Sequence, residues 1–274
     1  MIGIIGLGLI GGSLAALIQK QHPNTPIFAI DTDPASIAIA KEKKWITSGY
    51  TTLSECTDTP TLLFICTPLS LIKETVIAAS KQFAEKPLII TDVGSVKTPF
   101  IISEKELSKN HTYIPGHPMA GSEKNGIAFA KAEILKKATY FLIQKEQKNT
   151  LTTLLESLTF NLVFTTSEAH DHLMSSASHM PYLLSCLTIA NSMTTPQLSS
   201  GISTGFKDTT RIAESNPEWG KDILLLNQKN ILKELENLEK NIKNIKKWIQ
   251  ENNTEELTKY LSEIQHFRKK LYNK

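Results

Sequence analysis

Residues 1–18 read MIGIIGLGLIGGSLAALI, and this stretch decides the fold that we expect. A short apolar run leads into closely spaced glycines, and a run with helical character follows. In a strand–turn–helix unit the first glycine permits a tight turn, the second lets the backbone approach a pyrophosphate, and the third lets helix and strand pack closely. Free N–H groups at the start of the helix then attract phosphate. We therefore predict a dinucleotide cradle made by Gly6, Gly8, Leu9, Ile10 and Gly11.

Two later stretches extend this cradle. Asp31 ends the run PIFAID, twenty residues after Gly11. A carboxylate at that position accepts hydrogen bonds from ribose hydroxyls and repels the 2′-phosphate of NADP, and no arginine follows it, so NAD is favoured over NADP. Thr67 and Pro68, in ICTPLS, follow another strand-like run and should lie at the carboxyl edge of the sheet, where ligands bind. Thr67 would contact the cofactor or, alternatively, cap the next helix.

The first 165 residues alternate between short apolar runs and helical stretches. Several runs are continuous rather than alternating, as in strands buried on both faces. We predict an α/β fold with a Rossmann-type, doubly wound, mostly parallel sheet, followed by an all-α helical dimerisation domain. The predicted domains are 1–166, which binds NAD, and 167–274, which is helical. The strand candidates are MIGIIGLG, PIFAID, TLLFICTP, PLIITDVGS, TYIPG, TYFLIQ and NLVFTT, and the helix candidates in this half are 11–20, 34–44 and 69–83.

The helical half should begin with a buried helix over 168–200. Asn216 and Pro217 then fit the N-cap and the first position of another helix. Asn253 and Glu256 fit a capping pair before a last helix. Between them, apolar residues recur at alternating intervals of four and three, as in a heptad seam. This seam could pack within one chain, but its length in a small helical domain favours a homodimer interface. Its residues are Ile231, Leu235, Leu238, Ile242, Ile245 and Ile249.

Composition and spacing argue against several kinds of partner. A net charge of +3 over 274 residues, with no basic stripe interleaved with aromatics, does not indicate nucleic acid. Cys56, Cys66 and Cys186 are odd in number and form no CxxC, which fits a reducing cytoplasm rather than disulfides or zinc. The histidines of HDH, at 170–172, point to different sides of a helix, so we expect no metal. The glycine-interrupted N-terminus has no basic region before it, and no run approaches the ~20 apolar residues of a membrane span. We expect a soluble, cytoplasmic protein without a membrane partner.

The candidate base is His117, in YIPGHPMAGSEKNG, residues 113–126. Pro118 disfavours a helical conformation at this histidine, which we place on a short loop at the sheet edge. A histidine near a nicotinamide suits proton transfer at neutral pH, and oxidation of an alcohol requires a base for the hydroxyl proton. Ser95, in TDVGSVK, should also lie at the carboxyl edge. The alternatives are a hydrogen-bonded loop histidine and an ordinary turn serine.

The helical half adds two candidate stretches. SASHMPY contains Ser178, His179 and Tyr182, and GFKDTTRIAES contains Asp208 and Arg211. Asp208 is close enough in sequence to orient the guanidinium, which would make Arg211 a bidentate clamp for a substrate carboxylate. The alternative is a surface ion pair, which contributes little.

These stretches resemble the prephenate/arogenate dehydrogenases of tyrosine biosynthesis. The resemblance covers nearly the whole chain and rests on GLGLIGGS, TDVGSVK, GHPMAGSEKNG, HDHLMSSASHMPY, GFKDTTRIAESNPEW and DILLLN, in the family's order. It implies a Rossmann domain, a helical dimerisation domain and an active site in the cleft between them. It also implies that NAD⁺ oxidises prephenate to 4-hydroxyphenylpyruvate, or arogenate to tyrosine, with loss of CO₂ as the ring becomes aromatic.

The resemblance also implies roles for single residues. His117 matches the histidine that accepts the ring hydroxyl proton, and Ser95 matches the serine that orients this hydroxyl. Arg211 matches the arginine that grips a substrate carboxylate, with Asp208 in support. The residues matched to the substrate lining are Ser122, Glu123 and Ser178, and those matched to the entrance are Asp171 and Trp219, the latter from either subunit of a dimer.

One position departs from the family pattern. Many prephenate-using members carry a second histidine where SHMPY places Tyr182. A phenol donates a hydrogen bond but carries no positive charge, so arogenate stays open as the substrate. Two other hypotheses remain. One is a β-hydroxyacid dehydrogenase, which usually relies on a lysine of the helical domain. The other is a non-catalytic NAD-binding regulator that dimerises through its helices.

Overall fold

The computed structural model describes residues 1–272. Contacts divide the described chain into two compact units, the first Met1–Gln228 and the second from Lys229 onward. The domain boundary that we expect after residue 166 stays a prediction. No helix of the described residues is long and apolar enough to cross a membrane.

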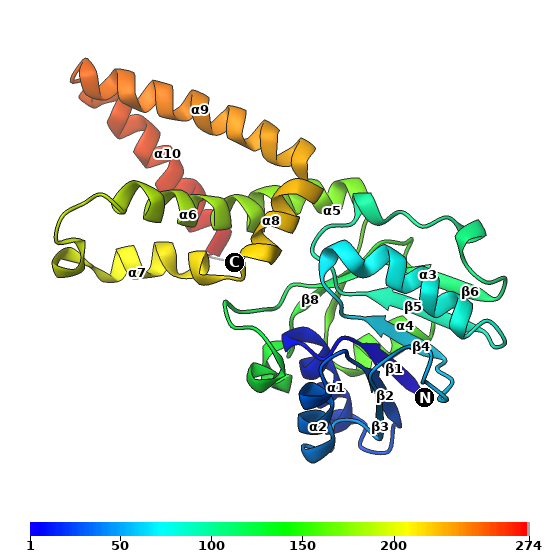
Figure 1. Ribbon diagram of the computed structural model, residues 1–274. Helices are drawn as coiled ribbons and strands as arrows, with labels where there is room; N and C mark the ends of the chain where they lie inside the picture. The colour runs from blue at the N-terminus through cyan, green and yellow to red at the C-terminus, as the bar shows by residue number, and fades with distance from the viewer. Residues whose placement is uncertain (273–274) are drawn as a thin grey trace. The chain divides into compact units, whose positions relative to one another are not determined.

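The first unit contains a six-stranded sheet in the order β3-β2-β1-β4-β5-β6 (Figure 1). All neighbouring strands are parallel, and the order reverses between β1 and β4, as in a doubly wound fold. The predicted Rossmann-type sheet is therefore confirmed. The strands are β1 (Ile2–Ile5), β2 (Ile27–Ile30), β3 (Ser48–Tyr50), β4 (Leu62–Ile65), β5 (Leu88–Asp92) and β6 (His111–Ile114).

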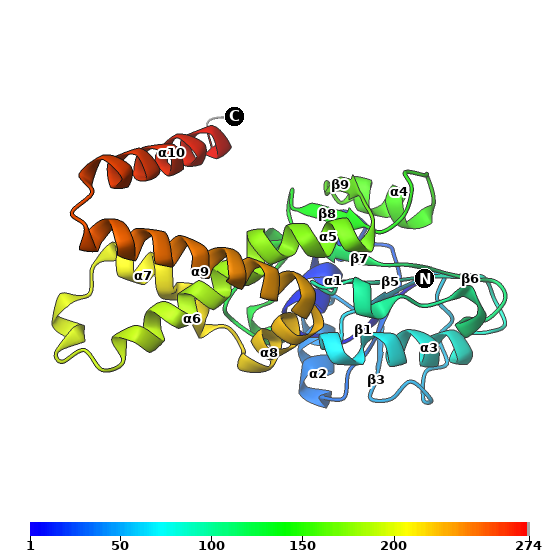
Figure 2. The same ribbon diagram turned by 90° about the horizontal axis from the view of Figure 1, so that it is seen from above.

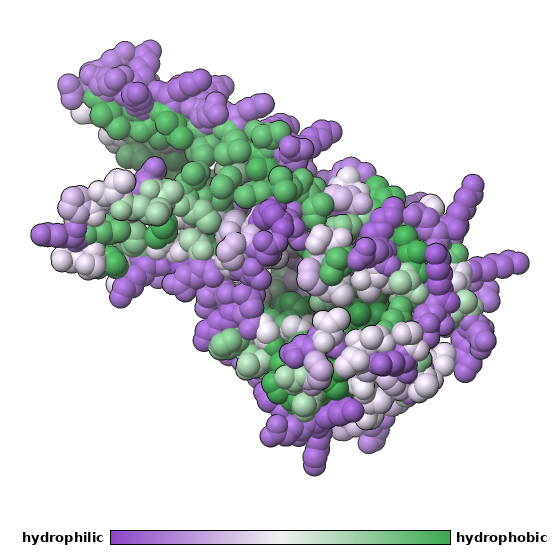
Figure 3. All heavy atoms as spheres, in the orientation of Figure 1, coloured by the Kyte–Doolittle hydropathy of each residue, from purple (hydrophilic) through white to green (hydrophobic). Residues whose placement is uncertain are grey.

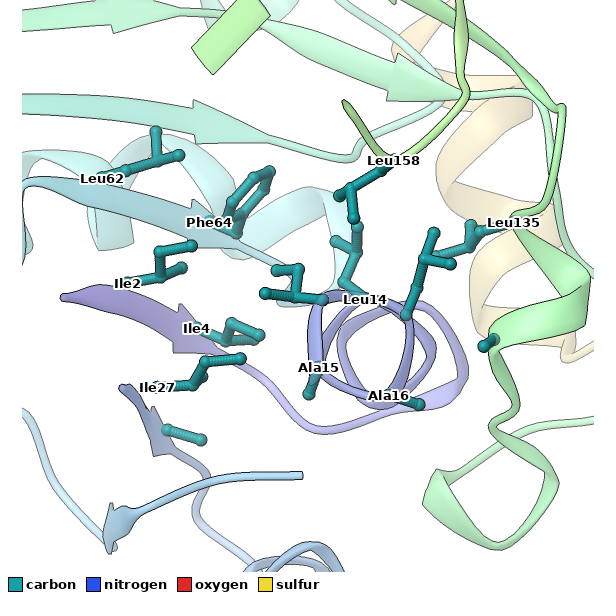
Figure 4. Packing of buried hydrophobic residues seen from close by; sticks show 14 of the residues in the cluster. Ile2, Ile4, Leu14, Ala15, Ala16, Ile27, Leu62, Phe64, Leu135 and Leu158 are labelled. Atoms are coloured by element: carbon teal, nitrogen blue, oxygen red, sulfur yellow. The ribbon is translucent and has the colours of Figure 1, made fainter. Parts of the chain in front are cut away.

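Helices cover both faces of this sheet, which explains the continuous apolar strands. Successive residues of a strand point to opposite faces, so Phe64 joins one apolar cluster and Leu63 the other. Figure 4 shows Ile4 and Phe64 facing Leu14 of the first helix. In Figure 2 one helix, α3, lies on one side of the sheet, with α4 on the other. The helices of this region are α1 (Leu9–Gln21), α2 (Pro34–Glu42), α3 (Ile72–Gln82) and α4 (Thr150–Ser157).

A second, three-stranded sheet lies in the same unit, in the order β7-β8-β9. Its first strand pairs antiparallel with the second, and His117 lies opposite Phe141. The loop that we expect around His117 is therefore wrong, because this residue belongs to a strand. Strands β3 and β7 escape prediction because each has only three residues and little apolar pattern, so their partner strands define them. The bounds are β7 (Gly116–Pro118), β8 (Thr139–Leu142) and β9 (Asn161–Phe164).

From residue 167 to residue 272 the chain forms helices joined by short turns, and no strand. The single buried helix expected over 168–200 is wrong in three respects, the first being that the helix ends at Ser192. A π-helical turn at Ser175–His179 interrupts it, and Leu184 and Leu187 are exposed. The predicted N-cap is confirmed, because the Asn216 side chain accepts a hydrogen bond from the Glu218 amide. The helices here are α5 (Ser167–Met174), α6 (Met180–Ser192), α7 (Thr204–Thr210) and α8 (Pro217–Leu226).

The heptad seam lies on one long helix, α9 (Gln228–Gln250), and α10 (Thr254–Tyr272) follows it. Asn253 caps α10, as predicted, because its Oδ1 accepts a hydrogen bond from the Glu256 amide at 3.1 Å. Figure 3 shows apolar side chains gathered along one side of α9 and hydrophilic ones along the opposite side. Ile242 is 52% exposed and Ile249 is 60% exposed, so the seam is incompletely covered in the single chain.

Candidate active site

A cavity of about 1080 Å³ opens at the carboxyl edge of the six-stranded sheet. The residues that follow β1, β2, β4 and β5 line it, at the place where open α/β sheets bind ligands. Its size exceeds the ~300–1,000 Å³ of most single-ligand pockets. Most predicted site residues line this cavity: Gly6, Gly8, Leu9, Ile10, Asp31, Thr67, Pro68, Ser95, His117, Ser122, Glu123, Ser178, Tyr182 and Arg211. Gly11 and Asp208 do not.

The glycines of the cradle differ in what they permit. Gly6 has a φ of +97°, a conformation that side chains disfavour. A Cβ on Gly11 would lie 1.9 Å from the Gly6 carbonyl oxygen, so this glycine allows the helix to pack against the turn. A Cβ on Gly8 would meet nothing within 4 Å in the protein, which leaves the backbone open to a ligand. This arrangement fits a bound pyrophosphate.

Asp31 is held beside the cradle by two backbone amides. Its Oδ2 accepts from the Leu7 amide at 2.6 Å, and its Oδ1 accepts from the Asp33 amide at 2.8 Å. Each carboxylate oxygen keeps a lone pair for a ribose hydroxyl. Helix α2 is capped by Asp33, which leaves Asp31 free for that role.

Thr67 does not cap the next helix, because the turn after it has no side-chain cap. Its hydroxyl is buried, and no partner for it is found within residues 1–272. A buried polar atom of this kind usually signals a ligand or a water. With the open Gly8 and the fixed Asp31, these residues fit NAD.

His117 reaches the cavity from the short strand β7. Its ring stacks on Phe141, with centroids 6.5 Å apart, and its Nδ1 lies 2.9 Å from Nε2 of His170. Burial lowers the pKa of His117 well below 6.5, and the charges of His170, Lys97 and His179 lower it further. His117 is therefore uncharged at neutral pH, with one ring nitrogen able to accept a proton, as a general base requires.

A buried ion pair fixes strand β7 to the end of β5. Lys97 pairs with Asp92 and donates to the Gly116 carbonyl oxygen at 2.6 Å. Tyr113 donates to the same carboxylate at 2.6 Å. Burial lowers the pKa of Lys97, while Asp92 opposes this shift. The pair therefore holds the backbone next to His117.

Two further groups complete the buried polar region. The Ser95 hydroxyl lines the cavity without a hydrogen-bond partner in the described chain, so it is free to bind a ligand hydroxyl. His179 is buried, and its Nδ1 lies 3.1 Å from Nδ2 of Asn227. Because an amide nitrogen donates, Nδ1 of His179 accepts. Burial lowers the pKa of His179 to about 4.

The Arg211 guanidinium pairs with Glu123 at 2.8 Å. Its side chain is 58% exposed, and both residues line the cavity. The predicted support by Asp208 is wrong. Asp208 is exposed near the end of α7, away from the cavity lining, and takes part in no described ion pair. The carboxylate that orients Arg211 comes from the loop after His117 instead.

Tyr182 forms part of the cavity wall with Trp219 of the same chain, and their ring centroids are 5.3 Å apart. A Cβ on Gly220 would lie 2.1 Å from the Tyr182 hydroxyl, so the phenol occupies the space that this glycine leaves. Burial raises the pKa of Tyr182, and Cys186 raises it further. The phenol is therefore neutral at physiological pH.

Two buried groups near His117, His170 and Lys97, have no role that the sequence predicts, and Asp171 differs from its expected place. His170 stands out in the sequence only as half of a possible metal pair, and Lys97 only as part of TDVGSVK. Asp171 is not at an entrance, since it is 1% exposed and absent from the cavity lining. The buried position of Asp171 depends on the tertiary structure and cannot be deduced from the local sequence. No group of three or more metal-binding side chains is found in residues 1–272.

Comparisons with known proteins agree with this architecture. Two protein-family models match the chain: "Prephenate dehydrogenase, nucleotide-binding domain" over residues 14–160 and "Prephenate dehydrogenase, dimerization domain" over residues 166–263. Prephenate dehydrogenase of Bacillus subtilis is 31% identical, over 97% of this chain and 74% of that protein. Cyclohexadienyl dehydrogenase of Zymomonas mobilis is 27% identical, over 97% of this chain and 94% of that protein.

Solved structures resemble the chain over almost its whole length. Prephenate dehydrogenase from Aquifex aeolicus, in complex with hydroxyphenyl propionate and NAD⁺, has a TM-score of 0.89 and 28% identity, and covers 98% of this chain and 97% of its own. Arogenate dehydrogenase from Synechocystis has a TM-score of 0.77 and 28% identity, over 98% of this chain and 99% of its own.

Proposed function

Because the chain belongs to the prephenate dehydrogenase family, we propose that it catalyses the NAD-dependent oxidative decarboxylation of prephenate to 4-hydroxyphenylpyruvate in tyrosine biosynthesis. The observation that carries this proposal is the position of His117. A buried, uncharged histidine faces the same cavity as a glycine cradle that fits NAD. No lysine of residues 167–272 lines that cavity, which argues against a β-hydroxyacid dehydrogenase.

Bound NAD⁺ supplies the hydride acceptor. Nδ1 of His117 is engaged by His170, so Nε2 is the nitrogen that takes the proton of the ring hydroxyl. Loss of the ring carboxylate as CO₂ leaves its electron pair in the ring, which becomes aromatic. The proton on His117 then returns to the ring oxygen, giving a phenol. The base thus acts only transiently, and the overall reaction releases no proton.

The other cavity residues bind and orient the substrate in this proposal. Ser95 has a free hydroxyl for the ring hydroxyl, and Arg211 offers its guanidinium to a substrate carboxylate. Glu123 holds that guanidinium in the cavity wall, and the carboxylate of an incoming substrate competes with Glu123 for it. Ser122 and Ser178 supply further hydroxyls along the lining.

We also propose that the protein is a homodimer of cytoplasmic location with the domains 1–166 and 167–274. The match to a dimerization-domain model and the exposed apolar residues of α9 support the dimer. The free state of all three cysteines is consistent with a reducing compartment. Light scattering over a range of protein concentrations tests the dimer directly.

The function is tested by following NADH with prephenate and with arogenate in parallel, and by identifying the product. We expect NADH and 4-hydroxyphenylpyruvate to form in equal amounts from prephenate. Faster turnover of arogenate, with tyrosine as the product, would move the assignment to that substrate. A non-catalytic regulator would bind NAD in a fluorescence titration but form no NADH with either compound.

A further inference from the structure

Behind His117, away from the cavity, lies a chain of buried ionisable side chains. Nδ1 of His117 is 2.9 Å from Nε2 of His170, and Nδ1 of His170 is 2.8 Å from Oδ1 of Asp171. His117 is 8% exposed, and the other two are almost completely buried. Neither His170 nor Asp171 lines the cavity, so neither contacts substrate. The hydrogen bond to His117, which does line the cavity, connects them to the reaction.

Asp171 is fixed as an acceptor. Its two oxygens accept the backbone amides of Lys97 and Thr98 at 2.8 and 2.7 Å. Burial opposes its ionisation, but the hydrogen bonds from His170, Thr98 and Lys97 more than offset this and lower the pKa of Asp171. An ionised carboxylate has no proton to donate, so Nδ1 of His170 must carry one.

The proton on Nδ1 of His170 determines the tautomer of His117. When His170 is neutral and protonated on Nδ1, its Nε2 has only a lone pair and must accept. The bond between the two histidines therefore requires a proton on Nδ1 of His117. Nε2 of His117, the nitrogen left for the cavity, is then the unprotonated one. The opposite tautomer would present an N–H to the substrate hydroxyl and could not accept its proton.

We propose that His170 and Asp171 are positioning residues that hold His117 in the tautomer with a basic Nε2 and stabilise its protonated form during turnover. This proposal rests on the function proposed above. When the ring hydroxyl proton moves to Nε2, the positive charge formed on His117 is shared through Nδ1–H with His170, and Asp171 supplies the compensating negative charge. The proton returns to the product oxygen, so Asp171 stays ionised throughout.

Other groups face the same imidazole. Lys97 lies between β5 and β7, where Asp92 balances its charge, and His179 comes from the π-helical turn. Phe141 of β8 covers the ring without charge. Lys97, His179 and a charged His170 all disfavour a protonated His117, whereas a neutral His170 accepts a hydrogen bond from Nδ1–H of His117. Asp171 is thus the carboxylate in this group that favours it, acting through His170.

Three variants separate positioning from packing. His170→Leu removes the acceptor for Nδ1–H of His117, whereas His170→Gln places an amide oxygen near the same point. His172→Leu is the matched control, because His172 is exposed on the same helix and its side chain takes no described role. We avoid Asp171→Asn because it would also disrupt the two hydrogen bonds that Asp171 accepts from backbone amides.

With prephenate and NAD, we expect His170→Leu to lower kcat by about 10- to 100-fold, the effect of losing one hydrogen bond to a charged group. Its KM for prephenate and its NAD affinity should stay close to those of the wild type. The acid limb of its kcat profile should move about one unit lower in pH, because protonated His117 has lost its support. His170→Gln should recover most of kcat, and His172→Leu should match the wild type.

The tautomer itself is measured by ¹⁵N chemical shifts of the imidazoles at pH 8, without substrate. We expect Nδ1–H for His117 in the wild type and His170→Gln, and a mixture of tautomers in His170→Leu. An Nε2–H tautomer in the wild type would overturn the proposal, as would equal losses of kcat in the leucine and glutamine variants. Absence of turnover by the wild type would instead refute the proposed function and leave the tautomer result standing.

Discussion

The two ends of the cavity are built in different ways. The nucleotide end is formed mainly by backbone. Gly6 has an uncommon positive φ, Gly11 allows a close approach of helix and turn, and backbone amides hold the Asp31 carboxylate. At the substrate end, ionisable side chains from distant segments meet around His117. The first end depends on the space that two glycines leave around the backbone, and the second depends on the protonation of buried side chains.

The largest effect should come from the substrate end. We expect His117→Asn to lower kcat by ~10²- to 10⁴-fold, the usual contribution of a general base. Because the smaller amide side chain replaces the imidazole on β7 without touching the cradle, the affinity for NAD, measured by fluorescence titration, should not change. Near-normal kcat in this variant would mean that another group takes the hydroxyl proton.

A pair of substitutions tests the nucleotide end. Gly11→Ala should reduce the free energy of unfolding by about 1–3 kcal/mol, because its Cβ meets a backbone oxygen that cannot move aside. Gly8→Ala should leave stability unchanged, since its Cβ meets no protein atom, and should lower only the affinity for NAD. Urea unfolding and NAD titration distinguish the two. Equal losses of stability would show that Gly8 is needed for folding rather than for the ligand.

Acidification should weaken the substrate end selectively. His117 and His179 have lowered pKa values in the folded protein, so the unfolded state binds more protons below pH 6.5. Their contribution to stability is complete above that pH and is lost as pH falls through the lowered pKa of each histidine, which is about 4 for His179. For His179 alone we expect a loss of about 2 kcal/mol between pH 6.5 and 5. Urea midpoints of the wild type and His179→Gln measure it, and identical pH slopes would refute it.

The smallest effect concerns the choice of nucleotide. Asp31→Ser removes the negative charge that would repel a 2′-phosphate, and we expect the ratio of NAD to NADP affinities to fall by about 10-fold. Titration of both nucleotides against the wild type and the variant gives this ratio. An unchanged ratio would assign the preference to a residue other than Asp31.

The two ends also differ in how far the sequence predicts them. The cradle lies within one strand–turn–helix unit, so the spacing of Gly6, Gly8 and Gly11 is enough to predict it, and Asp31 follows from the next strand. The inner strands β1 and β4, with β2 and β5 beside them, are predictable because they are apolar runs buried between two clusters, whereas β3 is not.

The surroundings of His117 are not predictable in the same way. Strand β7 exists through its pairing with β8, and the π-helical turn at Ser175–His179 leaves no apolar pattern. The contact between His117 and His170 joins residues 53 positions apart, and local spacing contains no information about it. The predicted partner of Arg211 is wrong for a similar reason, because Glu123 reaches it from 88 positions away.

The fit between Tyr182 and Gly220 limits the order in which this sequence can evolve. Any side chain at position 220 would collide with the phenol, so we expect substitutions of Gly220 to be destabilising while Tyr182 remains. A smaller residue at position 182 must come first, and only then does position 220 become free to vary. The two sites therefore form an epistatic pair on the wall of the cavity. A change in the shape of this wall is reached through position 182 before position 220.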